Sequence, residues 1–159
     1  MQSEANAVLE DDGGVCGVRA KNSAGELDIK ARLVIGADGR GSTVRNSCGL
    51  AVDALGAPMD VLWFSLPTGK EDPDEAMGSF AAGNILIMIR RTTHWQCGLV
   101  INKGSRDQLQ AAGIDSLRQK IVQLAPFVDD RRDEIRDWDQ IKLLTVSVER
   151  VRTERKSVV

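Results

Sequence analysis

Leu33-Val-Ile-Gly-Ala-Asp-Gly-Arg-Gly-Ser-Thr-Val-Arg45 is the stretch that decides the fold of this chain. Its first five residues are uniformly apolar, which predicts a strand buried on both faces. Asp38 and two glycines then predict a turn. Residues 42–48 predict a short helix that Ser42 caps and Gly49 ends. A strand, a turn and a helix in this order indicate an α/β unit.

The turn combines several features of a nucleotide-binding site. Gly36 is small enough for a ligand to approach closely, and Asp38 follows the carboxyl end of the strand, where α/β sheets bind ligands. Gly39 allows turn conformations that other residues avoid. Ser42 begins a helix whose N–H groups suit a phosphate, and Arg45 adds a cation. An ordinary strand-to-helix connection explains the same spacing, and the G-x-G-x-x-G order is missing.

The segment resembles the Asp-Gly motif of the class A flavoprotein monooxygenases, the p-hydroxybenzoate hydroxylase-like family. Leu33 and Gly41 depart from the pattern, because the family often has charged or polar residues there. Weaker resemblance extends over about residues 7–152. The matching positions are Val34-Ile35, Gly36-Ala37, Asp38-Gly39, Ser42, Val44 and Arg45.

The resemblance implies FAD as cofactor and NAD(P)H as reductant. Asp38 would contact the ribose–pyrophosphate region of FAD, while Gly36 and Gly39 would permit its close approach. Ser42 and Arg45 would support the phosphate side. The implied activity is a monooxygenase that uses dioxygen to hydroxylate an aromatic or other hydrophobic small molecule. Because the flavin carries the difficult chemistry, we name no catalytic side chain.

The flanking segments predict antiparallel β-structure. Before the motif, turns at Gly13-Gly14 and at 22–25 predict a three-stranded meander. After a connector at 50–59, Ser105 and Asp115 are expected to cap two helices, the second with an apolar stripe. The stripe is Leu117, Ile121 and Leu124, and strands are expected at 60–66, 79–82, 85–90, 95–101 and 141–148.

These patterns predict a mixed α/β and α+β fold, with part of an FAD-binding Rossmann-like domain joined to an antiparallel-sheet substrate domain with helices. The expected bounds are 1–52 for the partial FAD-binding domain, 53–149 for the substrate domain and 150–159 for an atypical tail. Substrate-facing side chains are expected on the sheet, without deciding its face, around Leu62, Phe64, Phe80 and Trp95.

Two parts of the family pattern are absent from the sequence. No G-x-G-x-x-G unit precedes Leu33, and no Gly-Asp motif follows Arg152. We therefore expect an internal fragment that is inactive alone. Exposed apolar surface should make it marginally stable and self-associating.

Composition excludes several other classes of protein. The 21 basic and 23 acidic residues are well mixed, which argues against nucleic-acid binding. No apolar run approaches the ~20 residues of a membrane span, and no secretory signal is recognisable. Three scattered cysteines suit reduced thiols in the cytoplasm. The acidic run 71–75 lacks the spacing of a calcium loop, so it and Arg131-Arg132 are expected to be solvated, with no metal site.

Two alternatives stay open at this point. Flavoproteins of the geranylgeranyl reductase or halogenase type share a similar Asp-Gly segment, although the strand around Trp95-Gln-Cys97 favours the hydroxylases. A chloride-dependent product would distinguish a halogenase. The short N-terminal part also allows a binding or interaction module without redox chemistry.

Overall fold

The computed structural model describes residues 2–154 and divides the chain into two compact units. The first unit contains the residues up to Leu55 together with those from Glu149 onward. The second unit spans Gly56–Val148. Two connections therefore join the units, at 55–56 and at 148–149.

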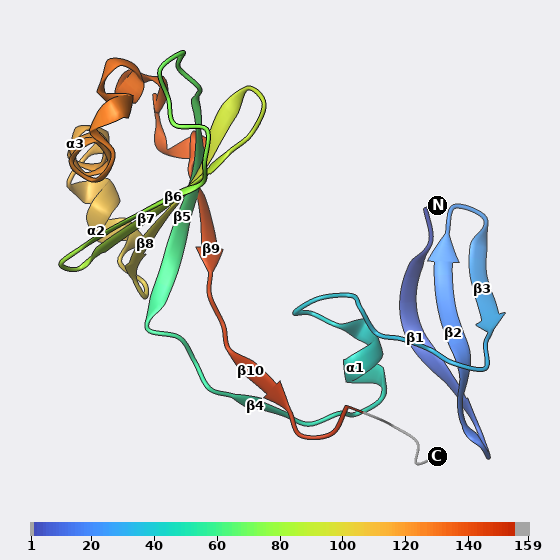
Figure 1. Ribbon diagram of the computed structural model, residues 1–159. Coiled ribbons are helices and arrows are strands. Elements are labelled where there is room, and N and C mark those ends of the chain that lie inside the picture. The colour runs from blue at the N-terminus through green and yellow to red at the C-terminus, as the bar shows by residue number, and fades with distance from the viewer. Residues whose placement is uncertain (1, 155–159) are drawn as a thin grey trace. The chain divides into compact units, whose positions relative to one another are not determined.

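The first unit begins with the predicted antiparallel meander of β1 (Glu4–Asp11), β2 (Gly14–Asn22) and β3 (Gly25–Lys30), visible in Figure 1. In the second turn, the side chain of Asn22 accepts a hydrogen bond from the Ala24 N–H at 2.8 Å. Gly17 lies at a close approach between β2 and β3, because a Cβ there would be 2.2 Å from the Ile29 carbonyl oxygen. These local features confirm the predicted meander.

The apolar run 33–37 is not a strand, which corrects the prediction of a buried one. Leu33 and Ile35 are 73% and 77% exposed. A parallel strand needs hydrogen-bonded neighbours, and every strand pair among the described residues is antiparallel. The helix after it, α1 (Thr43–Ser47), is capped by Ser42 as predicted, and Gly49 follows its last turn with φ +63°.

The first residues of the segment expected to be an atypical tail from Arg150 belong to a strand. β4 (Val52–Ala54) pairs antiparallel with β10 (Glu149–Val151). Arg152 continues this contact, since its guanidinium lies 2.6 Å from the Asp53 carboxylate. Residues 155–159 of the predicted tail lie outside the described residues.

The second unit is built on a five-stranded antiparallel sheet in the order β6-β7-β8-β5-β9. Strand β5 lies between β8 and β9, and it aligns Leu62 with Leu99 on one side and with Leu143 on the other. The predicted strands are confirmed, although the last is shorter than the expected 141–148. Their bounds are β5 (Met59–Pro67), β6 (Met77–Ala81), β7 (Asn84–Arg90), β8 (His94–Asn102) and β9 (Lys142–Thr145).

Helices cover one face of this sheet (Figure 1). The predicted stripe of α3 is confirmed, because Leu117 and Ile121 are buried against the sheet. The predicted cap is wrong: Gly113, with φ +87°, precedes the helix, and Asp115 lies inside the first turn. Ser105 precedes α2, but its hydroxyl donates to Asn102 and caps nothing. The helical bounds are α2 (Arg106–Ala111), α3 (Ile114–Leu124), and the 3-10 helices η1 (Pro126–Glu134) and η2 (Trp138–Gln140).

Candidate functional site

The side chains of Asp38 and Ser42 fold the predicted turn onto the start of α1. The Ser42 hydroxyl donates to the Asp38 carboxylate at 2.5 Å and accepts from the Arg45 N–H at 3.0 Å. The Val44 N–H donates to the other Asp38 oxygen at 3.2 Å. The chain thus satisfies these helix-start amides itself, so they do not form the open phosphate site that the spacing suggested.

The same contacts set the charge of Asp38. The hydrogen bond from Ser42 is the main cause that holds the pKa of Asp38 below its ordinary value. Partial desolvation opposes this shift, and the Val44 N–H adds to it. Asp38 is therefore a carboxylate at neutral pH, with its charge directed at its own turn.

Gly36 and Gly39 are each required by the structure, but for different reasons. A Cβ at Gly36 would lie 3.0 Å from the side chain of Val44, so glycine lets α1 pack on the preceding segment. Gly39 has φ +79°, and a Cβ there would meet nothing within 4 Å. Gly39 therefore supplies the turn conformation on an open surface.

Arg45 is engaged by neighbouring groups. Its guanidinium donates to the Arg40 carbonyl at 2.8 Å and lies 3.4 Å from the Glu149 carboxylate. The Arg45 side chain is only 20% exposed. This arrangement ties the motif helix to β10, a link across more than one hundred residues of sequence.

These residues border a hollow of about 650 Å³ in the first unit, which we call the motif hollow. Gly36, Gly39, Ser42 and Arg45 line it, whereas Asp38 does not. The sequence interpretation missed several lining residues. For Arg32, the one feature of the sequence that could have indicated a place in the site is its position directly before the apolar run. The remaining lining residues are Val15, Arg32, Leu33, Val34, Ile35, Val44, Cys48, Leu50, Val151 and Glu154.

The sheet of the second unit leaves its other face open. Leu62, Phe64 and Trp95, at most 2% exposed, are buried in the core, so the expectation that they face a substrate is wrong. Phe80, at 73%, is exposed. Trp63 alternates with the buried positions of β5 and lies over Gly98, where a Cβ would be 3.2 Å from its ring. The open face also carries Val61, Ile85, Ile87 and Val100.

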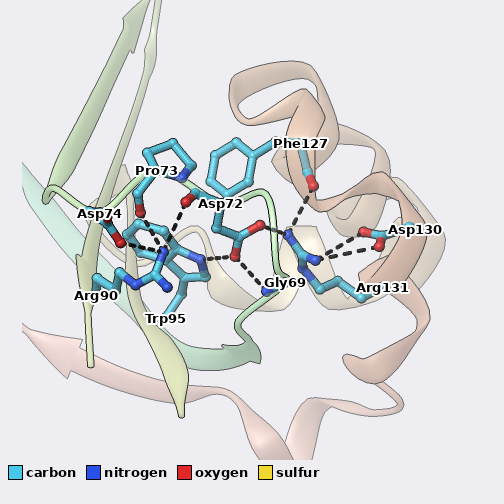
Figure 2. Close-up of polar contacts among 9 residues, drawn as sticks. All are labelled: Gly69, Asp72, Pro73, Asp74, Arg90, Trp95, Phe127, Asp130 and Arg131. Carbon is cyan, nitrogen blue, oxygen red and sulfur yellow. Dashed lines mark hydrogen bonds and ion pairs between the residues drawn. The ribbon is translucent and has the colours of Figure 1, made fainter. Parts of the chain in front are cut away.

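A buried polar cluster in the second unit corrects the prediction of solvated charges for Asp72 and Arg131. The other charges of the two runs are exposed, as predicted. Figure 2 shows Asp72 between Trp95 and Arg131. Its carboxylate accepts from the Gly69 N–H at 2.7 Å, from the Trp95 indole at 2.6 Å, and from Arg131. The side chain of Asp72 is 4% exposed and that of Arg131 is 11% exposed. We call these four residues the Asp72 cluster.

The cluster is electrostatically balanced. Burial alone would raise the pKa of Asp72, but the Gly69 N–H, the Trp95 indole and the charge of Arg131 outweigh it and lower the pKa below the ordinary 3.8. The indole N–H of a buried tryptophan needs an acceptor, which was the available sequence signal for this partner of Trp95. The cluster fixes the loop after β5 onto η1.

The other reactive groups of the described residues point to no further chemistry. The three cysteines are all thiols, and burial raises the pKa of Cys97 to about 12. Within residues 2–154, no group of three His, Cys, Asp or Glu side chains is placed to hold a metal ion. No helix in the same range is both long and apolar enough to cross a membrane.

Comparison with known proteins gives the family. The chain matches the profile of the FAD binding domain family over residues 1–153, so it belongs to that family. The predicted mixed fold, with an antiparallel sheet and helices, matches the solved structure of a probable FAD-dependent monooxygenase. The resemblance read from the Asp-Gly motif is thereby confirmed.

A curated relative is 6-methylpretetramide 4-monooxygenase of Streptomyces rimosus, 27% identical over 148 residues, which are 91% of this chain and 35% of the relative. The structure of PqsL, described as a probable FAD-dependent monooxygenase from Pseudomonas aeruginosa, has a TM-score of 0.69 at 18% identity. It matches 91% of this chain and 40% of PqsL. The anhydrotetracycline hydroxylase OxyS of Streptomyces rimosus has a TM-score of 0.59 at 16% identity, over 96% of this chain and 30% of OxyS. The chain thus spans 30% to 40% of the length of these proteins.

Proposed function

We propose that the chain forms part of an FAD-dependent, NAD(P)H-using monooxygenase that hydroxylates an aromatic or other hydrophobic small molecule. The observation that carries the proposal is the family match over residues 1–153, with the motif hollow inside the matched region. The named monooxygenase relatives support the reaction class. We expect no turnover from this chain alone.

The motif hollow suits part of a dinucleotide. Its volume of about 650 Å³ lies within the range of cofactor pockets, roughly 300–1,000 Å³. Gly39 leaves an unobstructed edge, and Ser42, whose hydroxyl is engaged by Asp38 and the Arg45 N–H, forms part of the wall. Asp38 would act by holding the turn in shape. When bound, the flavin would supply the redox chemistry with NAD(P)H and dioxygen.

The open face of the second unit's sheet suits the substrate. Trp63, Phe80 and Ile87 provide apolar surface on this face, and aromatic rings stack well on such surfaces. The covered face is filled by the core and has no room for a ligand.

We place the protein in the cytoplasm, in keeping with its three thiols.

An FAD titration of the 159-residue chain tests the cofactor half of the proposal. Saturable quenching of flavin fluorescence at one FAD per chain is the expected result. A chain that remains folded by circular dichroism and shows no saturable FAD binding would contradict the proposal. Lumiflavin, which lacks ribose and phosphates, is the matched ligand control.

A halogenase is the second candidate reaction. The structure of the chondrochloren halogenase CndH has a TM-score of 0.59 to this chain at 18% identity, so both reactions occur on this fold. A chloride-dependent product from the full-length protein would favour the halogenase. Hydroxylation independent of chloride would favour the monooxygenase.

A further inference from the structure

The two arginines of the motif hollow differ in what they already bind. Arg45 donates to Arg40 and pairs with Glu149, so its charge is used within the fold. Arg32 is exposed, and within residues 2–154 its guanidinium has no hydrogen-bond or ion-pair partner. The arginine that the motif selects is thus occupied, and its neighbour in the hollow is available.

The backbone holds Arg32 at a defined place. The Ala31 N–H donates to the Cys16 carbonyl at 2.9 Å, which anchors the residue before Arg32 to β2. Val15, adjacent to that anchor, lines the same hollow. The side chain of Arg32 therefore starts from a fixed point on the wall.

We propose that Arg32, rather than Arg45, binds the phosphate of the dinucleotide that the motif hollow accepts, an inference that rests on the proposed function. A guanidinium can donate two parallel hydrogen bonds to phosphate oxygens. Most other lining side chains are apolar, so few groups in the hollow compete for the Arg32 guanidinium. Glu154 is the one carboxylate among the lining residues, and it opposes an anion.

Three variants of the full chain test this assignment. Arg32→Gln removes the cation, and Lys21→Gln removes an equal charge from an exposed position of β2 outside the hollow. Glu154→Gln removes the opposing carboxylate and provides a test if Arg32→Gln fails to fold. The probes are FAD, ADP and riboflavin, the last without phosphate.

We expect Arg32→Gln to weaken FAD and ADP binding roughly tenfold while leaving riboflavin binding unchanged. Lys21→Gln should bind all three probes as the parent chain does. Glu154→Gln should tighten FAD and ADP binding. Raising the ionic strength should shrink both effects, because the charges lie at an exposed wall.

The outcomes separate this inference from the proposed function. Unchanged FAD and ADP affinities in folded Arg32→Gln, or unchanged affinities in Glu154→Gln, would overturn the assignment. Binding of ADP without riboflavin or FAD, weakened by Arg32→Gln, would remove the flavin function and keep the phosphate contact. No binding of FAD or ADP by the folded parent chain would remove both.

Discussion

Asp72 carries a negative charge on a side chain that is almost fully buried in the second unit. Asp72→Asn should lower the free energy of unfolding by on the order of 3 kcal/mol, because it leaves Arg131 without its buried partner. The new side-chain amide would also direct an N–H group at donors that now face a carboxylate oxygen. Urea unfolding followed by tryptophan fluorescence measures this, since Trp63, Trp95 and Trp138 all lie in the second unit.

The effect of Asp72→Asn should depend on pH. The folded-state pKa is lowered, so the stabilisation is present above the ordinary pKa of 3.8 and is lost as pH falls through the folded value. Parent and variant should therefore converge only in strong acid. Asp74→Asn is the control, because that carboxylate is 95% exposed. If the free energies of unfolding of Asp72→Asn and the parent differed by the same amount at every pH, the charge argument would be contradicted.

Individual residues of this cluster were hard to predict from the sequence. The run 71–75 has the composition of a solvated loop, and only the fold brings Asp72 to Trp95 and Arg131. A Cβ at Gly69 would meet the Arg131 guanidinium at 2.2 Å, yet its glycine resembles any turn glycine in the sequence. Whether a charged side chain is buried depends on partners that are distant in sequence. The composition of a short run describes only residues that are adjacent in sequence.

At the scale of elements, α1 depends on its N-terminal cap. Ser42→Ala should cost about 1 kcal/mol and reduce hydrogen-exchange protection of the Arg45 amide, which donates to the Ser42 hydroxyl. The pKa of Asp38 should rise, because the Ser42 hydrogen bond is the main cause of its lowering. Carboxyl titration by NMR measures that shift.

Ser47→Ala is the matched control for the cap, because it makes the same chemical change at an exposed position of the same helix. It should leave the Asp38 titration where it is in the parent chain. An unchanged Asp38 titration in folded Ser42→Ala would show that the turn does not depend on this hydroxyl.

Elements with local signals were predictable, and those that depend on distant partners were not. The meander, the long sheet strands and the α3 stripe follow from turn glycines and apolar periodicity. The run 33–37 has the composition of a buried parallel strand, but no described segment pairs with it. The pairing of β4 with β10 is the reverse case, because two short segments without a strand signal form strands when they pair with each other.

For the chain as a whole, Asp60 fixes the points where the backbone enters and leaves the second unit. Its carboxylate accepts from Lys103 at 2.7 Å, from the Gly104 N–H at 3.0 Å and from the Val146 N–H at 3.1 Å. The hydrogen bond from Lys103 is the main cause that lowers the pKa of Asp60. The Lys103 backbone N–H also donates to the Pro58 carbonyl, so both connections are held near one buried carboxylate.

Exposed apolar surface should govern how the whole chain behaves in solution. The open sheet face ends at the edge strand β6, where the Phe80 ring lies over Gly78 and near Ile87. We predict that the chain self-associates through this face, so that its weight-average mass in sedimentation velocity rises with concentration. Phe80→Lys should weaken the association roughly tenfold, because it removes the buried ring area.

The control for this prediction is Ala81→Lys, which adds the same charge to the exposed end of the same strand and keeps the ring. If the apolar face drives association, Ala81→Lys should associate as the parent chain does. Equal weakening by both variants would instead assign the contact to the β6 edge, where any added lysine disfavours strand pairing. A parent chain that remains monomeric at every concentration would contradict self-association altogether.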